Sequence, residues 1–117
     1  MLDITIDEND DGDYVVCRPA GELDAYTVGQ FRETLSELST RPRLVIDLSD
    51  VPFMDSAGLG ALIGGIRRVR EAEGRVSVAC SRPALTRLLH TTGFDRIVPV
   101  TESLEEAVAR LDETPDL

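Results

Sequence analysis

The sequence contains no tryptophan, and aromatic residues account for only 4% of its 117 residues. A hydrophobic core must therefore be built from leucine, valine, isoleucine and alanine side chains. No apolar run approaches the roughly 20 residues that a membrane-spanning helix needs. The first ten residues, MLDITIDEND, are acidic and lack the basic and apolar regions of a secretory signal peptide. We therefore expect a cytoplasmic protein that does not interact with a membrane.

Positive charge is also scarce. The chain has 12 lysine and arginine residues against 22 aspartate and glutamate residues, and its formal net charge is -10. Nucleic acid is excluded as a partner because this charge would repel its phosphates. A protein partner should instead present a basic surface.

Residues that bind metals or form disulfides are few. Cys17 and Cys80 both lie in apolar stretches, which is typical of buried, reduced thiols, and a disulfide between them is the alternative. Two cysteines and the single histidine, His90, make a poor set of metal ligands. The chain also lacks the pattern G-x-x-x-x-G-K-[ST], so the glycine-rich stretch GLGALIGG does not indicate a nucleotide site. We expect neither a metal nor a cofactor.

The residues that are present suffice for one folded domain, since 42% of the chain is hydrophobic. Alternating apolar and polar residues predict a strand over residues 2–7, and the apolar run YVVCRPA predicts a second strand over 14–20. The turn-forming residues ENDDGD between them predict a hairpin. Pro19 should end the regular pairing of the second strand, because proline has no N–H to donate.

Helices and strands alternate in the rest of the chain. The predicted helices begin near Thr27, Asp55, Pro83 and Ser103, and the predicted strands cover residues 43–49, 75–80 and 96–100. Thr27 with Gln30, and Ser103 with Glu106, have the spacing of capping boxes. The order ββαβαβαβα predicts a single α/β domain over residues 1–117, with a mixed, mostly parallel sheet covered by helices. Residues 112–117 are expected to form a frayed tail.

The stretch FMDSAGLGAL, residues 53–62, holds the main candidate for a functional residue. Ser56 lies where a predicted strand leads into a helix, and ligands of open α/β sheets gather at such strand ends. Serine and aspartate are also preferred helix caps, so capping is the simplest interpretation. A nucleophilic serine would sit in a G-x-S-x-G turn beside an oriented histidine, whereas His90 lies near the end of a helix. We therefore expect no catalytic residue.

Small residues continue from this stretch into the predicted helix. Ala57, Gly60, Ala61 and Gly64 fall on one side of it, opposite the leucines. One interpretation is close packing of this helix against a neighbouring element. The other is a shallow surface that the backbone of another protein approaches, and helical spacing alone does not separate the two.

The segment DLSDVPFMDSAGLGALIGG, with GELDAYT upstream and RLLHTTGFDRIVPV downstream, closely resembles the bacterial anti-sigma-factor antagonists of the STAS-domain family. The resemblance extends from about residue 4 to residue 111, and D-S-x-G-L-G is its most specific part. It implies that a partner anti-sigma factor, itself a serine kinase, phosphorylates Ser56. Many members of the family carry serine or threonine where this chain has Ala57, which leaves Ser56 as the only hydroxyl in the motif.

The resemblance also implies a surface that contacts the kinase. The residues that correspond to it are Glu22, Leu23, Asp24, Asp55, Ser56, Ala57 and Gly58. Asp24 is expected to meet a basic residue of the kinase; the alternatives are a solvated loop residue or an Asx-turn ahead of the first helix. Asp55 is expected either to cap the helix or to orient Ser56.

By this resemblance the protein is a regulator of transcription and not an enzyme. Its unphosphorylated form would bind the anti-sigma serine kinase and release the sigma factor, as in stress responses. Phosphorylation of Ser56 would block that binding, and a phosphatase acting on phosphorylated Ser56 would restore it. The alternative is a STAS protein-interaction module that regulates another signalling partner without phosphorylation.

Overall fold

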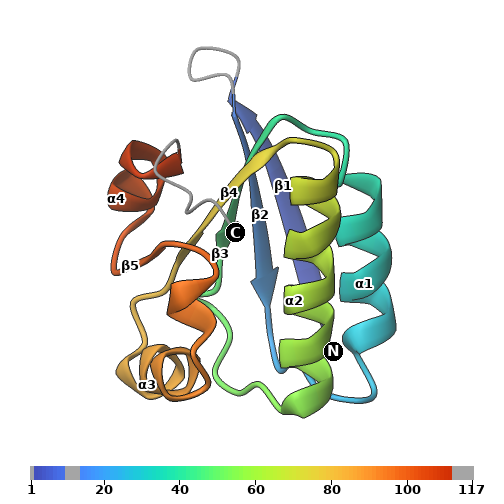
Figure 1. Ribbon diagram of the computed structural model, residues 1–117. Helices are drawn as coiled ribbons and strands as arrows, with labels where there is room; N and C mark the ends of the chain where they lie inside the picture. The colour runs from blue at the N-terminus through green and yellow to red at the C-terminus, as the bar shows by residue number, and fades with distance from the viewer. Residues whose placement is uncertain (1, 10–13, 112–117) are drawn as a thin grey trace.

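A computed structural model describes residues 2–9 and 14–111. These residues form a five-stranded sheet in the order β1–β2–β3–β4–β5 (Figure 1). The strands are β1 (Asp3–Asn9), β2 (Tyr14–Ala20), β3 (Arg43–Asp47), β4 (Arg75–Ala79) and β5 (Val100–Thr101). The helices are α1 (Val28–Glu37), α2 (Ser56–Glu71), α3 (Pro83–Thr91) and α4 (Leu104–Ala109), with a short 3-10 helix, η1, at Phe94–Arg96.

The topology is the predicted one. β1 and β2 pair antiparallel, whereas the pairs β2–β3, β3–β4 and β4–β5 are all parallel. Helices separate the parallel strands along the chain, as right-handed crossovers require. The α/β fold with the element order ββαβαβαβα is therefore confirmed. The predicted tail at 112–117 and residues 10–13 of the predicted hairpin turn lie outside the described residues.

The helices cover the two faces of the sheet unequally. α1 and α2 lie side by side on one face, and α4 lies on the other (Figure 1). Side chains alternate accordingly along β3: Leu44 and Ile46 belong to the larger core with α1 and α2, while Val45 belongs to a smaller cluster with Ala107 and Leu111. This burial on both faces explains why the strand reads as an unbroken apolar run.

Two predictions about strands need correction. Pro19 was expected to end regular pairing; the parallel ladder with β3 does stop at Cys17, but the antiparallel ladder with β1 continues to Ala20. A proline interrupts a ladder only on the side toward which its N–H would point. The last strand exists, but its predicted bounds of 96–100 are wrong: Arg96 is the last residue of η1, and the strand covers Val100–Thr101. Pro99, without an N–H, directly precedes the two paired residues.

Of the two predicted capping boxes, the structure contains one and lacks the other. Ser103 caps α4 as predicted, since its Oγ accepts a hydrogen bond from the N–H of Glu106. The predicted capping box at Thr27 is wrong. Its Oγ1 makes no capping bond and instead donates to the carbonyl oxygen of Glu22 at 2.7 Å. The hydroxyl of Thr27 thus fastens the preceding loop to the start of α1.

Both cysteines are buried, free thiols, as predicted. Burial raises the pKa of the Cys17 thiol to about 12, because the interior disfavours the charged thiolate. Within the described part of the chain, no helix combines the length and the apolar character that crossing a membrane would require.

Candidate functional site

Two loops that are distant in the sequence are hydrogen-bonded to each other beside the start of α2. Leu23, in the loop after β2, forms an isolated parallel bridge with Met54, in the loop after β3. The N–H of Leu23 donates to the carbonyl oxygen of Phe53 at 2.9 Å, and the N–H of Asp55 donates to the carbonyl oxygen of Leu23 at 3.1 Å. We call the segments 22–24 and 53–55 the paired loops.

The paired loops exist because β2 and β3 are neighbours in the sheet. Both loops leave the sheet at the carboxyl ends of these parallel strands, and the bridge between Ala20 and Asp50 continues the pairing outward. The structure therefore brings together the residues that the sequence placed on the candidate surface. It does so at the edge of the sheet where ligands of α/β proteins usually bind.

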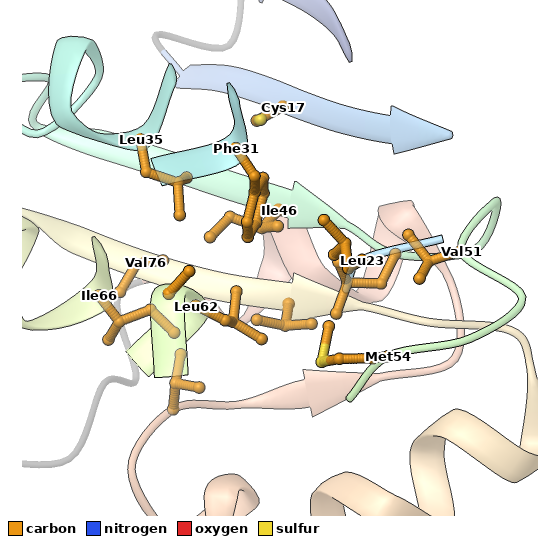
Figure 2. Close-up of a cluster of buried hydrophobic side chains, with 14 of the residues drawn as sticks. Cys17, Leu23, Phe31, Leu35, Ile46, Val51, Met54, Leu62, Ile66 and Val76 are labelled. Carbon is orange, nitrogen blue, oxygen red and sulfur yellow. The ribbon is translucent and has the colours of Figure 1, made fainter. Parts of the chain in front are cut away.

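Side chains alternate between inside and outside along the paired loops. Leu23 and Met54 are buried and pack with Val51 at one end of the larger core (Figure 2). Glu22 and Phe53 are exposed, and Asp24 is half-buried. Leu23 therefore supports a surface from beneath, while its neighbours on either side form that surface.

Asp24 organises the loop that leads into α1. Its Oδ1 accepts hydrogen bonds from the backbone N–H groups of Tyr26 and Thr27, at 2.9 and 3.2 Å. The N–H of Asp24 itself donates to Oγ1 of Thr27 at 3.1 Å. The expected turn role of Asp24 is confirmed by these bonds. A contact between Asp24 and a basic residue of a partner stays a prediction.

Asp55 is the N-cap of α2, and Ser56 is the first residue of the helix. Oδ1 of Asp55 accepts hydrogen bonds from the N–H groups of Ala57 and Gly58 at 2.9 and 3.0 Å. Ser56 is exposed, and its hydroxyl makes no hydrogen bond with any residue that the structure describes. The capping interpretation thus applies to Asp55, and the hydroxyl of Ser56 is available to solvent.

Among the described residues, none is hydrogen-bonded to this hydroxyl as a general base would be. Nδ1 of His90 lies 2.6 Å from Oδ2 of Asp95, so the only histidine of the chain pairs with a carboxylate near η1. In the described ranges, no three histidine, cysteine or carboxylate side chains are grouped closely enough to hold a metal ion. The arrangement suits a hydroxyl that accepts a group from an external enzyme better than one that attacks a substrate.

The small residues of α2 lie in two different environments, one closely packed and one open. A Cβ atom at Gly58 would lie 2.5 Å from the carbonyl oxygen of Leu23, and one at Gly65 would lie 2.5 Å from Cδ1 of Leu35. Close packing is thus the role of Gly58 and Gly65, together with the buried Ala61. Added Cβ atoms at Gly60 and Gly64 would meet nothing within 4 Å. These two glycines therefore leave part of the surface of α2 shallow.

Sequence reasoning missed two residues that the structure places at this surface. Tyr26 is 98% exposed and Phe53 is 51% exposed. The available signal was the presence of two aromatic residues in loops of a chain that has only five aromatic residues. Alternation of buried and exposed side chains around Met54 would have predicted that Phe53 is exposed. That prediction required knowing that residues 53–55 pair with residues 22–24.

Comparison with known proteins assigns this chain to a family. Residues 3–107 match the STAS domain, and the chain belongs to the STAS-domain family. It is 33% identical over 101 residues to the anti-sigma-B factor antagonist of Listeria monocytogenes, covering 85% of this chain and 88% of that protein.

Solved structures agree with this assignment. An anti-sigma factor antagonist from Mycobacterium paratuberculosis superposes with a TM-score of 0.86 at 27% identity, covering 96% of this chain and 95% of that one. The Bacillus cell fate determinant SpoIIAA in its phosphorylated form has a TM-score of 0.67 at 25% identity, covering 92% of this chain and 98% of that one.

Proposed function

We propose that this protein is an anti-sigma-factor antagonist that works by partner switching and is not itself an enzyme. In its unphosphorylated form it binds an anti-sigma factor that is also a serine kinase, and so releases the sigma factor. The kinase transfers the γ-phosphoryl group of ATP to Oγ of Ser56, which loses its proton, and ADP is released. Phosphorylated Ser56 blocks the binding until a phosphatase removes the phosphate.

The observation that carries this proposal is the state of the Ser56 hydroxyl. It is exposed, lies at the first residue of a helix, and forms no hydrogen bond with the described residues. A kinase can therefore reach it without unfolding any element. The names of the relatives support the same role: the Listeria protein is called an anti-sigma-B factor antagonist, and SpoIIAA has been solved in a phosphorylated form.

The proposed switch acts on surface charge and leaves the fold intact. A phosphate adds about 1.5 to 2 negative charges at neutral pH, and a helix N-terminus tolerates an anion well. The nearby N–H groups of Ala57 and Gly58 already donate to Asp55, so the phosphate adds its charge beside a carboxylate that keeps its own donors. A partner surface that accommodates a neutral hydroxyl must then desolvate an anion.

The test uses the full chain and an anti-sigma serine kinase from the same organism. The protein and the kinase are incubated with ATP, and mass spectrometry locates the phosphate, with Ser56→Ala as the control. Phosphate on Ser56, none on the alanine variant, and loss of the complex after phosphorylation are the expected results. Stable binding without phosphate would instead favour a STAS interaction module that regulates another signalling protein. Phosphate on a different residue would refute the assignment of Ser56.

A further inference from the structure

Two exposed aromatic side chains flank the candidate site. Among the described residues, the large hydrophobic side chains that are exposed are Ile6, Tyr26 and Phe53, at 38%, 98% and 51%. The chain's other aromatic residues are buried or half-buried. The exposed aromatic area is thus concentrated on the loop before α1 and on the loop before α2: Phe53 belongs to the paired loops, and Tyr26 lies two residues after them.

Both aromatic residues are presented by backbone that is held in place. The carbonyl oxygen of Phe53 accepts the hydrogen bond from Leu23, and the next residue, Met54, is anchored in the core. The N–H of Tyr26 donates to Oδ1 of Asp24. A partner that buries these rings therefore pays little entropy for ordering the loops, which favours tight association.

Exposed tyrosine and phenylalanine side chains on a fixed backbone are typical of interaction surfaces. Large aromatic side chains supply much of the binding free energy of protein interfaces, most of all near the centre of the contact. Exposed apolar area that gathers beside one site, as it does on these two loops, is a mark of an interaction surface. The rings of Tyr26 and Phe53 are thus better explained by a partner than by the stability of this domain.

The charges around the two rings indicate what kind of partner it is. Acidic side chains accompany them at Glu22, Asp24, Asp50 and Asp55. No lysine or arginine occurs in residues 19–31 or 44–66, so both loops are free of basic residues. A complementary surface has apolar pockets rimmed by lysine or arginine.

We propose that Tyr26 and Phe53 are the apolar anchors through which this protein binds its anti-sigma kinase, each ring entering an apolar pocket with a basic rim. This inference rests on the proposed function and adds to it the residues that supply affinity. Ser56 lies at the same surface, so a phosphate there places charge at an interface that the aromatic rings hold together. The anchors determine how tightly the complex forms, and Ser56 determines whether it forms.

The experiment measures the dissociation constant between the full chain and the kinase by calorimetric titration for wild type, Tyr26→Ser and Phe53→Ser. Each substitution is expected to weaken binding at least about tenfold, which corresponds to the loss at an interface hot spot. The loss should be the same at low and high salt, because it removes apolar area and no charge. Ile6→Ser is the matched control, since it removes an exposed apolar side chain from the edge strand β1 and should leave the affinity unchanged.

Phe53 is 51% exposed and the rest of its side chain is covered by the domain, so Phe53→Leu provides a second variant that retains apolar contact within the domain. It should bind with an affinity between those of wild type and Phe53→Ser while melting at the wild-type temperature. Wild-type affinity in both serine variants would overturn the role of the anchors and leave the proposed function standing. Failure of the wild-type protein to bind the kinase would overturn the proposed function, and the anchors with it. Equal weakening by Ile6→Ser would show that the effect is not specific to the two aromatic residues.

Discussion

The carbonyl oxygen of Leu23 lies only 2.5 Å from the position that a Cβ atom of residue 58 would occupy. The loop before α1 thus rests directly on the first turn of α2, and Gly58 is the residue that permits this approach. A backbone carbonyl cannot rotate away as a side chain would. The geometry of the whole candidate surface therefore depends on a residue that is itself buried.

Gly58→Ala is expected to destabilise the domain by about 1–3 kcal/mol, because the methyl group forces the two segments apart. Gly60→Ala is the matched control. Its added methyl group would meet nothing within 4 Å, so removal of a helix glycine should stabilise the protein by up to about 1 kcal/mol. Urea unfolding of both variants measures the two changes in the free energy of unfolding. An unchanged free energy for Gly58→Ala would contradict the prediction, because it would mean that the paired loops can move apart without loss of stability.

Gly60→Ala also distinguishes the two interpretations of the small residues on α2. If the backbone of the kinase approaches this helix closely, the variant should unfold at higher urea concentration than wild type and yet bind the kinase less tightly. Unchanged affinity would mean that the shallow surface at Gly60 has no role in binding.

Ser56→Glu tests whether the switch acts through charge. The variant should stay folded, because a carboxylate at a helix N-terminus is favourable by less than about 1 kcal/mol. Binding to the kinase should weaken by an amount on the order of 2–5 kcal/mol, since an unpaired anion is desolvated at the interface. Part of that loss should diminish in high salt, which calorimetric titration at two ionic strengths would measure.

Ser56→Gln is the neutral variant of similar size. It should bind more tightly than Ser56→Glu at low salt. Equal weakening by the two substitutions would show that steric exclusion, and not charge, separates the partners.

Two substitutions separate the role of Asp24 in the turn from the role of its charge. Asp24→Ala removes the acceptor for the N–H groups of Tyr26 and Thr27 and should cost about 0.5–2 kcal/mol of stability, as loss of a capping acceptor does. Asp24→Asn keeps an oxygen acceptor and should retain most of the stability. If Asp24 also meets a basic residue of the kinase, the asparagine variant should bind more weakly than wild type while melting at nearly the same temperature.

The N-cap role of Asp55 predicts an asymmetry between adjacent residues. Asp55→Ala should cost about 0.5–2 kcal/mol, because the N–H groups of Ala57 and Gly58 lose their acceptor. Ser56→Ala should change stability by less than about 0.5 kcal/mol, as surface substitutions usually do. Thermal unfolding of the two variants provides the comparison, and a larger loss for Ser56→Ala would contradict the assignment of the cap.

The raised pKa of Cys17 predicts that the protein loses stability in alkaline solution. Its pKa is raised from 9.0 to about 12 in the folded state, so the folded protein retains a proton that the unfolded chain loses. The resulting stabilisation is complete below pH 9 and disappears as the pH rises toward 12. Urea unfolding at pH 8 and pH 10 should show a smaller decrease for Cys17→Ala than for wild type, and identical decreases would contradict the prediction.

The parts of this structure that could be predicted from the sequence depend on local patterns. The start of α2 follows from Asp55 and the apolar spacing after it, and the order of strands and helices follows from similar signals. The pairing of Leu23 with Met54 could not be predicted, because it depends on β2 and β3 being adjacent in the sheet. Tertiary contacts also decided the role of Thr27, whose hydroxyl bonds the preceding loop instead of capping a helix.

The resemblance located Ser56 but said little about how its surroundings are held. Phe53 is held by the backbone pairing of its loop with Leu23 and by the burial of the next residue, Met54, whereas the N–H of Tyr26 is bonded to Asp24. A pattern of single residues carries no information about such support. The surface was therefore only partly predictable, even where each of its acidic residues was identified.

The paired loops also determine how such a domain can be re-engineered. Residues 22–24 and 53–55 share two backbone hydrogen bonds, and Leu23 and Met54 are buried in the same core, so each segment supports the shape of the other. If only one segment were grafted onto a related domain, it would have to pair with that domain's own second loop, which has a different sequence. If these loops bind the partner as proposed, a chimera that exchanges both segments together is the smallest transplant expected to preserve partner choice.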